Sequence, residues 1–201
     1  MNTTSGRGAP AEKVITVVSG LPRSGTSLMM QMLEAGGLPA LTDGLRVPDP
    51  DNPRGYFEYE PVKNLARDVS WLAEAMGRAV KIVSQLLPYL PEGFDYRVVF
   101  MERHGVEVID SQDKMLARLG KANDELDRDR LMEIFAHQVF QAKTWLARRK
   151  IPVLYVDYLD CLVNPAATTA RLNDFLGGGL DEASMAAVVD RGLYRHRRGE
   201  V

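Results

Sequence analysis

The feature that most constrains this fold is a short apolar run near the start of the chain, followed at once by a glycine-bounded loop. Residues 14–18 have the sequence V-I-T-V-V, which is typical of a strand buried on both faces within a parallel sheet. Residues 20–25 interrupt this run, and apolar residues at helical spacing then continue to Gly36 and Gly37. A strand, a loop and a helix in this order open a βα unit, which predicts a parallel sheet covered by helices.

Strand and helix patterns alternate along the rest of the chain. Further strands are predicted for residues 80–87, 96–101 and 153–156, and helices for residues 61–76, 106–119, 124–149 and 182–190. Asn164 and Pro165 supply the cap and the first residue of one more helix, and Gly177 ends it. Residues 44–55 contain three prolines and are predicted to be a loop. We therefore expect an α/β protein with helices on a central parallel sheet.

Length and charge limit the functions that this chain can have. The 201 residues suit one domain, predicted over residues 12–201 behind a flexible tail of residues 1–11. A net charge of -2, from 25 basic and 27 acidic residues, gives no overall field for nucleic acid, so any anion site must be built locally. The single cysteine, Cys161, excludes an internal disulfide. No apolar run reaches the ~18 residues of a membrane span and no secretory leader is recognisable, so we expect a cytoplasmic protein that binds neither nucleic acid nor membrane.

The loop of residues 20–27, G-L-P-R-S-G-T-S, nearly matches the phosphate-binding pattern G-x-x-x-x-G-K-[ST]. Backbone N–H groups in such a loop converge on one point, where the dipole of the following helix adds positive potential. Thr26 stands where a nucleotidase has the lysine that binds the β- and γ-phosphates, and Arg23 is the only cation of the loop. The sequence therefore favours a ligand with a single phosphate-like group in this loop over a nucleoside triphosphate.

Residues 22–27 resemble the 5′-phosphosulfate loop of the sulfotransferases, which use 3′-phosphoadenosine 5′-phosphosulfate (PAPS) as sulfuryl donor and release 3′-phosphoadenosine 5′-phosphate (PAP). A second element of that family is an arginine after a later strand with a serine eight residues on, and Arg103 and Ser111 match it. Shorter similarities at residues 52–58, 81–84, 158–162 and 174–177 extend the resemblance over nearly the whole chain from residue 14. The resemblance implies a three-layer P-loop-like fold, PAPS as donor and no metal.

The resemblance also implies roles for single residues. Lys81 corresponds to the lysine that contacts the transferring group, and Glu58 is the first choice for the base that activates the acceptor, with Glu60 as the second. The residues implied to bind the donor are Arg23, Ser24, Gly25, Thr26, Ser27, Arg103, Ser111 and Tyr158. The acceptor is expected to be a small molecule or a glycan with a hydroxyl or an amine. The sequence leaves open its identity, the oligomeric state and any contact of the basic residues 191–198 with the 3′-phosphate.

Two other functions stay open at this point. The first is a small nucleotide kinase or NTPase, because residues 153–156 form an apolar strand that ends in Asp157, a candidate magnesium ligand. The second is a non-catalytic protein that binds PAP without transferring a sulfuryl group. The kinase differs from the sulfotransferase in the nucleotide that it binds. The non-catalytic protein would bind the same ligand as the sulfotransferase and differs from it only because no sulfuryl group is transferred.

Overall fold

The computed structural model describes residues 13–49, 52, 54–118, 120 and 127–190. The predicted tail and the basic residues 191–198 therefore lie outside the described residues. The described chain is built on a four-stranded sheet in the order β2-β1-β3-β4, and all neighbouring strands are parallel. Its strands are β1 (Val14–Gly20), β2 (Ala79–Lys81), β3 (Asp95–Glu102) and β4 (Val153–Asp157).

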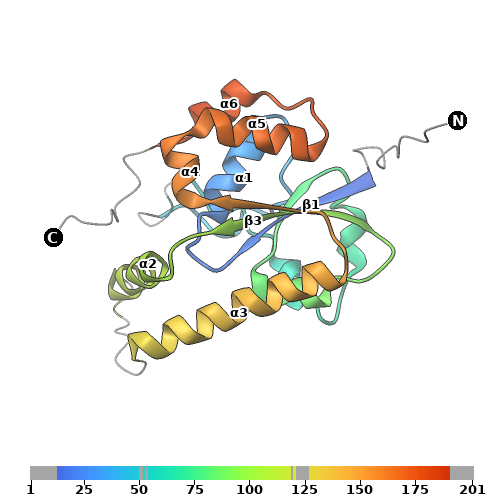
Figure 1. The fold of residues 1–201 in the computed structure, drawn as a ribbon. Coiled ribbons are helices and arrows are strands. Elements are labelled where there is room, and N and C mark those ends of the chain that lie inside the picture. Colours follow the sequence, from blue (N-terminus) through green and yellow to red (C-terminus); the bar gives the residue numbers. More distant parts are fainter. Residues whose placement is uncertain (1–12, 50–51, 53, 119, 121–126, 191–201) are drawn as a thin grey trace, which may run out of the picture.

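Helices cover both faces of this sheet, as Figure 1 shows. One layer contains α1 (Thr26–Ala35), α4 (Tyr158–Val163), α5 (Pro165–Leu176) and α6 (Glu182–Ala187). The other contains α3 (Arg128–Arg148) and the 3₁₀ turns η2 (Glu60–Asn64), η3 (Ser70–Ala73) and η4 (Ser84–Tyr89), while α2 (Gly105–Arg118) lies beyond the end of β3. This is the three-layer α/β architecture expected from the sequence.

The burial of β1 explains why its sequence is apolar at every position but two. All seven of its residues are buried. Ile15 and Val17 pack into the core on the α3 side, together with Trp71 of η3. Val18 packs into the core on the opposite side, together with Met29 of α1. A strand with an apolar layer on each face needs apolar side chains in both directions, which is the pattern of residues 14–18.

The register of β1 and β3 positions the two phosphate-binding elements that the sequence predicts. Gly20 at the end of β1 is paired with Met101, so the loop after β1 leaves the sheet beside the loop after β3. Arg23 and Arg103 are therefore brought to the same edge of the sheet, although 80 residues separate them. Neighbouring parallel strands end at a common edge, and open α/β sheets bind ligands at that edge.

Two predicted elements are wrong. Residues 61–76, expected to be one helix, form the separate turns η2 and η3. Asp68 lies in the gap between these turns, where its side chain accepts a hydrogen bond from the Ser70 N–H and so competes with continuous helical hydrogen bonding. Residues 80–87 were expected to be a strand, but β2 ends at Lys81 and η4 begins at Ser84.

Other boundaries differ by a few residues. The helix expected over residues 182–190 ends at Ala187, and α3 starts at Arg128, with residues 124–126 of its predicted range outside the described residues. The short helix α4 was not predicted; it follows β4 directly because the Asp157 carboxylate accepts a hydrogen bond from the Leu159 N–H at 2.7 Å. The helix capped by Asn164 and ended by Gly177 is confirmed as α5. None of the helices in the described residues combines the length and apolar character needed to cross a membrane.

Candidate active site

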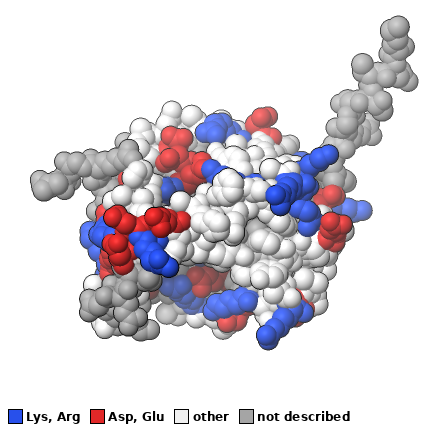
Figure 2. Space-filling model, turned by 60° about the horizontal axis from the view of Figure 1, so that its bottom comes forward, with Lys and Arg blue, Asp and Glu red and all other residues white. Residues whose placement is uncertain are grey.

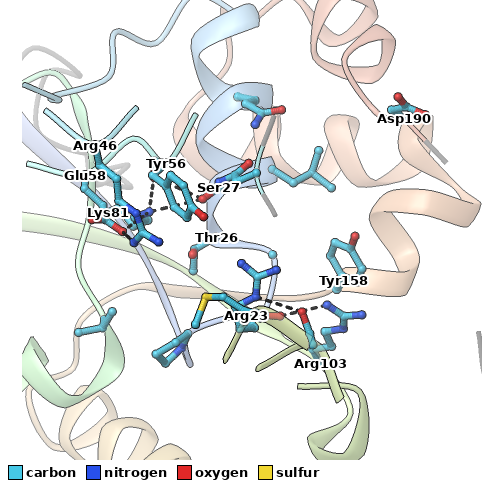
Figure 3. A pocket seen from close by; sticks show the side chains of 18 of the residues that line it. Arg23, Thr26, Ser27, Arg46, Tyr56, Glu58, Lys81, Arg103, Tyr158 and Asp190 are labelled. Atoms are coloured by element: carbon cyan, nitrogen blue, oxygen red, sulfur yellow. Dashed lines mark hydrogen bonds and ion pairs between the residues drawn. The ribbon is translucent and has the colours of Figure 1, made fainter. Parts of the chain in front are cut away.

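A cavity of about 380 Å³ opens at the carboxyl ends of the strands. Its lining includes residues from beside every strand, among them Arg23 after β1, Lys81 at the end of β2, Arg103 after β3 and Tyr158 after β4. Figure 3 shows these side chains around the start of α1. The volume is in the range of sites for small ligands and cofactors, ~300–1,000 Å³.

The charge of this cavity is a local property of the fold. On the face of the molecule in Figure 2, acidic and basic side chains are interspersed over the surface. The cavity differs from this surface in its charge balance, because its lining holds more cations than anions. The cations are Arg23, Arg46, Lys81, Arg103, Lys114 and Arg118, and the anions are Glu58 and Asp190. The excess of positive charge indicates a site for a multiply charged anion.

The loop after β1 has the backbone shape that anion binding requires. Gly25 is the N-cap of α1 and adopts φ 99°, a left-handed conformation that favours glycine. Because Gly25 has no side chain, it cannot itself satisfy the first N–H groups of α1, where Thr26 and Ser27 line the cavity. Ser24 has a different place: its buried hydroxyl donates a hydrogen bond to the Leu21 carbonyl at 2.7 Å, and Ser24 is not among the lining residues.

A network of polar contacts joins this loop to the element after β3. The Arg103 guanidinium, whose side chain is only 8% exposed, donates a hydrogen bond to the Arg23 carbonyl at 3.1 Å and pairs with Glu107 at 3.0 Å. It also lies over the Tyr158 ring, 4.4 Å from the ring centre. Arg23 in turn donates from Nε to the Ser111 hydroxyl at 3.0 Å. Four of the predicted donor-binding residues, Arg23, Arg103, Ser111 and Tyr158, thus form one connected group.

A second group of side chains lies on the other side of α1 in Figure 3. Lys81 Nζ donates hydrogen bonds to the Tyr56 carbonyl and, at 3.4 Å, to the Ser27 hydroxyl. Glu58 lies 3.6 Å from Lys81 Nζ and 2.8 Å from Arg46, whose guanidinium stacks on the Tyr56 ring. Two candidate catalytic residues, Glu58 and Lys81, are therefore in contact within the cavity that contains the donor-binding candidates.

Glu60, the second choice for the base, is placed differently from Glu58. Its carboxylate pairs with Lys63 at 2.6 Å, and both side chains are more than half exposed. Glu60 is not among the residues that line the cavity. The geometry therefore favours Glu58 over Glu60.

Backbone strain also gathers around this cavity. Among the described non-glycine residues, Arg23 (φ 70°), Phe57 (φ 52°) and Lys150 (φ 53°) have positive φ. Arg23 lines the cavity, and Phe57 stands between two lining residues, Tyr56 and Glu58. Such backbone conformations cost free energy and cluster at functional sites.

Burial lowers the pKa of the Lys81 side chain. Desolvation lowers its pKa from 10.5 to about 8, although the nearby Glu58 carboxylate opposes this effect. Between pH 8 and 10.5 the unfolded chain therefore binds a proton that the folded chain has lost, and stability rises with pH over this range. The difference between the two pKa values corresponds to about 3 kcal/mol.

We expect this pH dependence to disappear in Lys81→Met. Urea unfolding of the parent and of the variant at several pH values from 7 to 10.5 measures it. The free energy of unfolding of the parent should rise relative to that of the variant by up to about 3 kcal/mol as the pH rises. Below pH 8 the difference should stay constant, because both states then bind the proton. A constant difference over the whole range would contradict the lowered pKa.

Several lining residues were not predicted from the sequence. Lys114, Met115 and Arg118 follow Ser111 at intervals of three, four and seven residues, so the helical period of α2 could have found them. Arg46 and Tyr56 lie in or beside the proline-rich loop, and no periodic pattern marks them. Their positions depend on tertiary contacts, chiefly those with Glu58 and Lys81.

Comparison with known proteins bears on the fold. No protein-family model matches the sequence, and no curated protein matches it. Among solved structures, retinol dehydratase in complex with androsterone and the inactive cofactor PAP is similar, with a TM-score of 0.53 and 21% identity. The alignment covers 88% of this chain but 63% of that one, so this chain spans less than two thirds of its length. The sulfotransferase domain of the Synechococcus PCC 7002 olefin synthase gives a TM-score of 0.50 and 17% identity over 92% of this chain and 83% of that domain. The protein has the fold of sulfotransferases.

Proposed function

We propose that this chain is a sulfotransferase that uses PAPS to modify a hydroxyl or an amine of a small molecule or a glycan. The observation that supports the proposal is the joining of two candidate anion-binding elements in one cavity, through the hydrogen bonds of Arg23 with Ser111 and of Arg103 with the Arg23 carbonyl. PAPS carries anionic groups on both its 3′ and 5′ positions, whereas a nucleoside triphosphate carries all its phosphates on one. Two neighbouring elements suit the first arrangement.

The residues present fit such a donor. The loop of residues 20–27 and the start of α1 would hold the 5′-phosphosulfate, because backbone N–H groups and the helix dipole meet there. Arg103 and Ser111 would hold the 3′-phosphate, with charge-assisted hydrogen bonds from the guanidinium. Tyr158, directly against Gly25, would lie near the adenine.

The reaction needs a base at the acceptor and positive charge at the leaving group. When bound, PAPS supplies a sulfuryl group whose bond to the 5′-phosphate breaks as a bond to the acceptor oxygen or nitrogen forms, leaving PAP. The Glu58 carboxylate would accept the proton that the acceptor loses. Lys81, with a pKa of about 8, is mostly protonated at neutral pH and would stabilise the negative charge that develops on the phosphate. The ion pair between them places base and cation side by side.

The kinase interpretation has weaker support. Asp157, its candidate magnesium ligand, caps α4 through the Leu159 N–H and is not among the residues that line the cavity. Thr26 remains in the position where a phosphate-binding lysine is needed. No observation favours magnesium-dependent phosphoryl transfer over sulfuryl transfer.

A thermal-unfolding titration with PAP, run in parallel with magnesium-ATP, tests the proposal. A ligand at about 100 times its dissociation constant stabilises a protein by about 2.7 kcal/mol, which for a domain of this size raises Tm by roughly 5–10 °C. We expect this rise with PAP but not with magnesium-ATP. The double variant Arg103→Ala/Ser111→Ala should lose the rise, because it removes two candidate partners of the 3′-phosphate.

The variant also needs its own reference, because Arg103 is buried and ion-paired with Glu107. Its Tm without ligand shows how much of the change is structural, and only the ligand-induced rise counts as binding. A rise with magnesium-ATP alone would favour the kinase, and no rise with PAP would contradict the proposal. A rise of equal size in parent and variant would show that the 3′-phosphate binds elsewhere.

A further inference from the structure

The cation-bearing face of α2 extends the cavity beyond the residues already assigned to the donor. Ser111, Lys114 and Arg118 all line the cavity, at positions three and seven residues apart. An α-helix rises about 1.5 Å per residue, so the backbone of Lys114 lies about 4.5 Å, and that of Arg118 about 10 Å, farther along the axis than Ser111. Helical side chains lean toward the N-terminus of their helix. The Cα–Cβ bonds of both residues therefore tilt toward the end of α2 that is nearer Ser111, and both residues line the same cavity.

The charge balance around Arg103 gives these cations a role. The Arg103 guanidinium is paired with the Glu107 carboxylate at 3.0 Å, so this pair carries little net charge. Arg23 directs its Nε–H to the Ser111 hydroxyl. A phosphate monoester carries nearly two negative charges at neutral pH. The inner part of the site therefore offers hydrogen bonds in good geometry but less positive charge than such a ligand needs.

We infer that Lys114 and Arg118 form a cationic rim that binds the same 3′-phosphate from the solvent side. This inference rests on the proposed function, because it concerns the 3′-phosphate of PAPS and PAP. Arg46 and Lys81 are less suited to the role, since they lie with Glu58 and Tyr56 on the other side of α1 (Figure 3). The rim would give the protein its preference for a 3′,5′-bisphosphate over a nucleotide with a 5′-phosphate alone.

The test measures dissociation constants of PAP and of adenosine 5′-phosphate (AMP), which lacks only the 3′-phosphate. The variant is Lys114→Ala/Arg118→Ala. Both residues are exposed, and an exposed ion pair changes an affinity by a factor of about two to five. We expect the preference for PAP over AMP to fall about five- to tenfold in this variant. The loss should shrink at 0.5 M salt, because salt screens exposed charges.

Two matched variants control for charge and for folding. Arg130→Ala/Arg148→Ala removes two exposed cations from the neighbouring helix α3, outside the cavity lining, and should leave the preference unchanged. Lys114→Arg/Arg118→Lys keeps both charges and should keep the preference within about threefold.

Three results would overturn the inference. One is an unchanged preference in Lys114→Ala/Arg118→Ala while the parent still prefers PAP, which would leave the proposed function intact. Another is an equal loss of PAP and AMP affinity, which would make the cations a general attraction rather than a 3′-phosphate rim. The third is a parent that does not bind PAP, which would remove the proposed function together with the rim.

Discussion

Replacing Glu58 by glutamine is expected to slow sulfuryl transfer from PAPS by at least about a hundredfold without weakening PAP binding. The amide cannot accept the proton of the acceptor, so the base is lost. Glutamine has nearly the same shape, and the change removes a negative charge from the cavity, so the affinity for an anionic ligand should not fall. Transfer of a radiolabelled sulfuryl group from PAPS to a panel of phenols, alcohols, amines and sugars measures the rate, and calorimetry measures the PAP affinity.

Glu60→Gln is the matched control, because it makes the same change two residues away. Glu60 pairs with Lys63 outside the cavity lining, and its loss should change the transfer rate by less than about twofold. A large effect of Glu60→Gln together with a small one of Glu58→Gln would reverse the assignment of the base. If the parent binds PAP but transfers no sulfuryl group to any member of the panel, the non-catalytic interpretation gains support.

Gly25→Ala is expected to lower the free energy of unfolding by about 4 kcal/mol and Tm by about 10 °C. A methyl group at this position would lie 2.4 Å from Cδ2 of Tyr158, well inside van der Waals contact. Tyr158 is buried at the start of α4 and the Arg103 guanidinium lies over its ring, so the ring has little room to move. The change should also abolish the rise of Tm with PAP, because it displaces both the first loop and the Tyr158 ring. Thermal and urea unfolding, with and without PAP, measure both effects.

Gly93 provides a control with nearly the same φ but without the steric contact. Its φ is 97°, against 99° for Gly25, and a methyl group there would have no atom within 4 Å. Gly93→Ala therefore measures the cost of the left-handed conformation alone, about 1 kcal/mol. Equal losses in the two variants would show that Tyr158 does not restrict the loop. A loss in Gly25→Ala several times larger than in Gly93→Ala would confirm the close packing of loop and ring.

The strands β1, β3 and β4 and the capped helix were predictable because local chemistry alone specifies them. The run of residues 14–18 supplies apolar side chains to both faces of the sheet, and the Asn164, Pro165 and Gly177 signals at the ends of α5 act within a few residues.

The helix predicted over residues 61–76 is wrong because the spacing of its apolar residues also fits two separate short turns. Leu65, Val69, Leu72 and Met76 would lie on one face of that helix. The structure buries Leu65 and Leu72 but leaves Val69 and Met76 more than a third exposed. Two short turns bury the first pair without the second.

The candidate site was predictable to the extent that its residues follow strands. Arg23 and Arg103 lie at strand ends, so the parallel sheet brings them together, whereas only the resemblance to the sulfotransferases relates Ser111 to Arg103. The roles proposed for these residues remain predictions, because shared fold at 17–21% identity does not establish them. Arg46 could not be found from sequence, since its position is fixed by stacking on Tyr56 and pairing with Glu58 rather than by any local pattern.

The burial of Cys161 in α4 makes this protein suitable for spectroscopic labelling. Cys161 is the only cysteine of the chain, its side chain is fully buried, and desolvation raises the pKa of its thiol to about 12. The thiol is therefore protonated and shielded from reagents at neutral pH. A cysteine introduced at the exposed Leu45, next to Arg46, would react alone and could carry a fluorophore or a spin label without removal of the native thiol. The loop beside the cavity could then be followed directly while donor and acceptor bind.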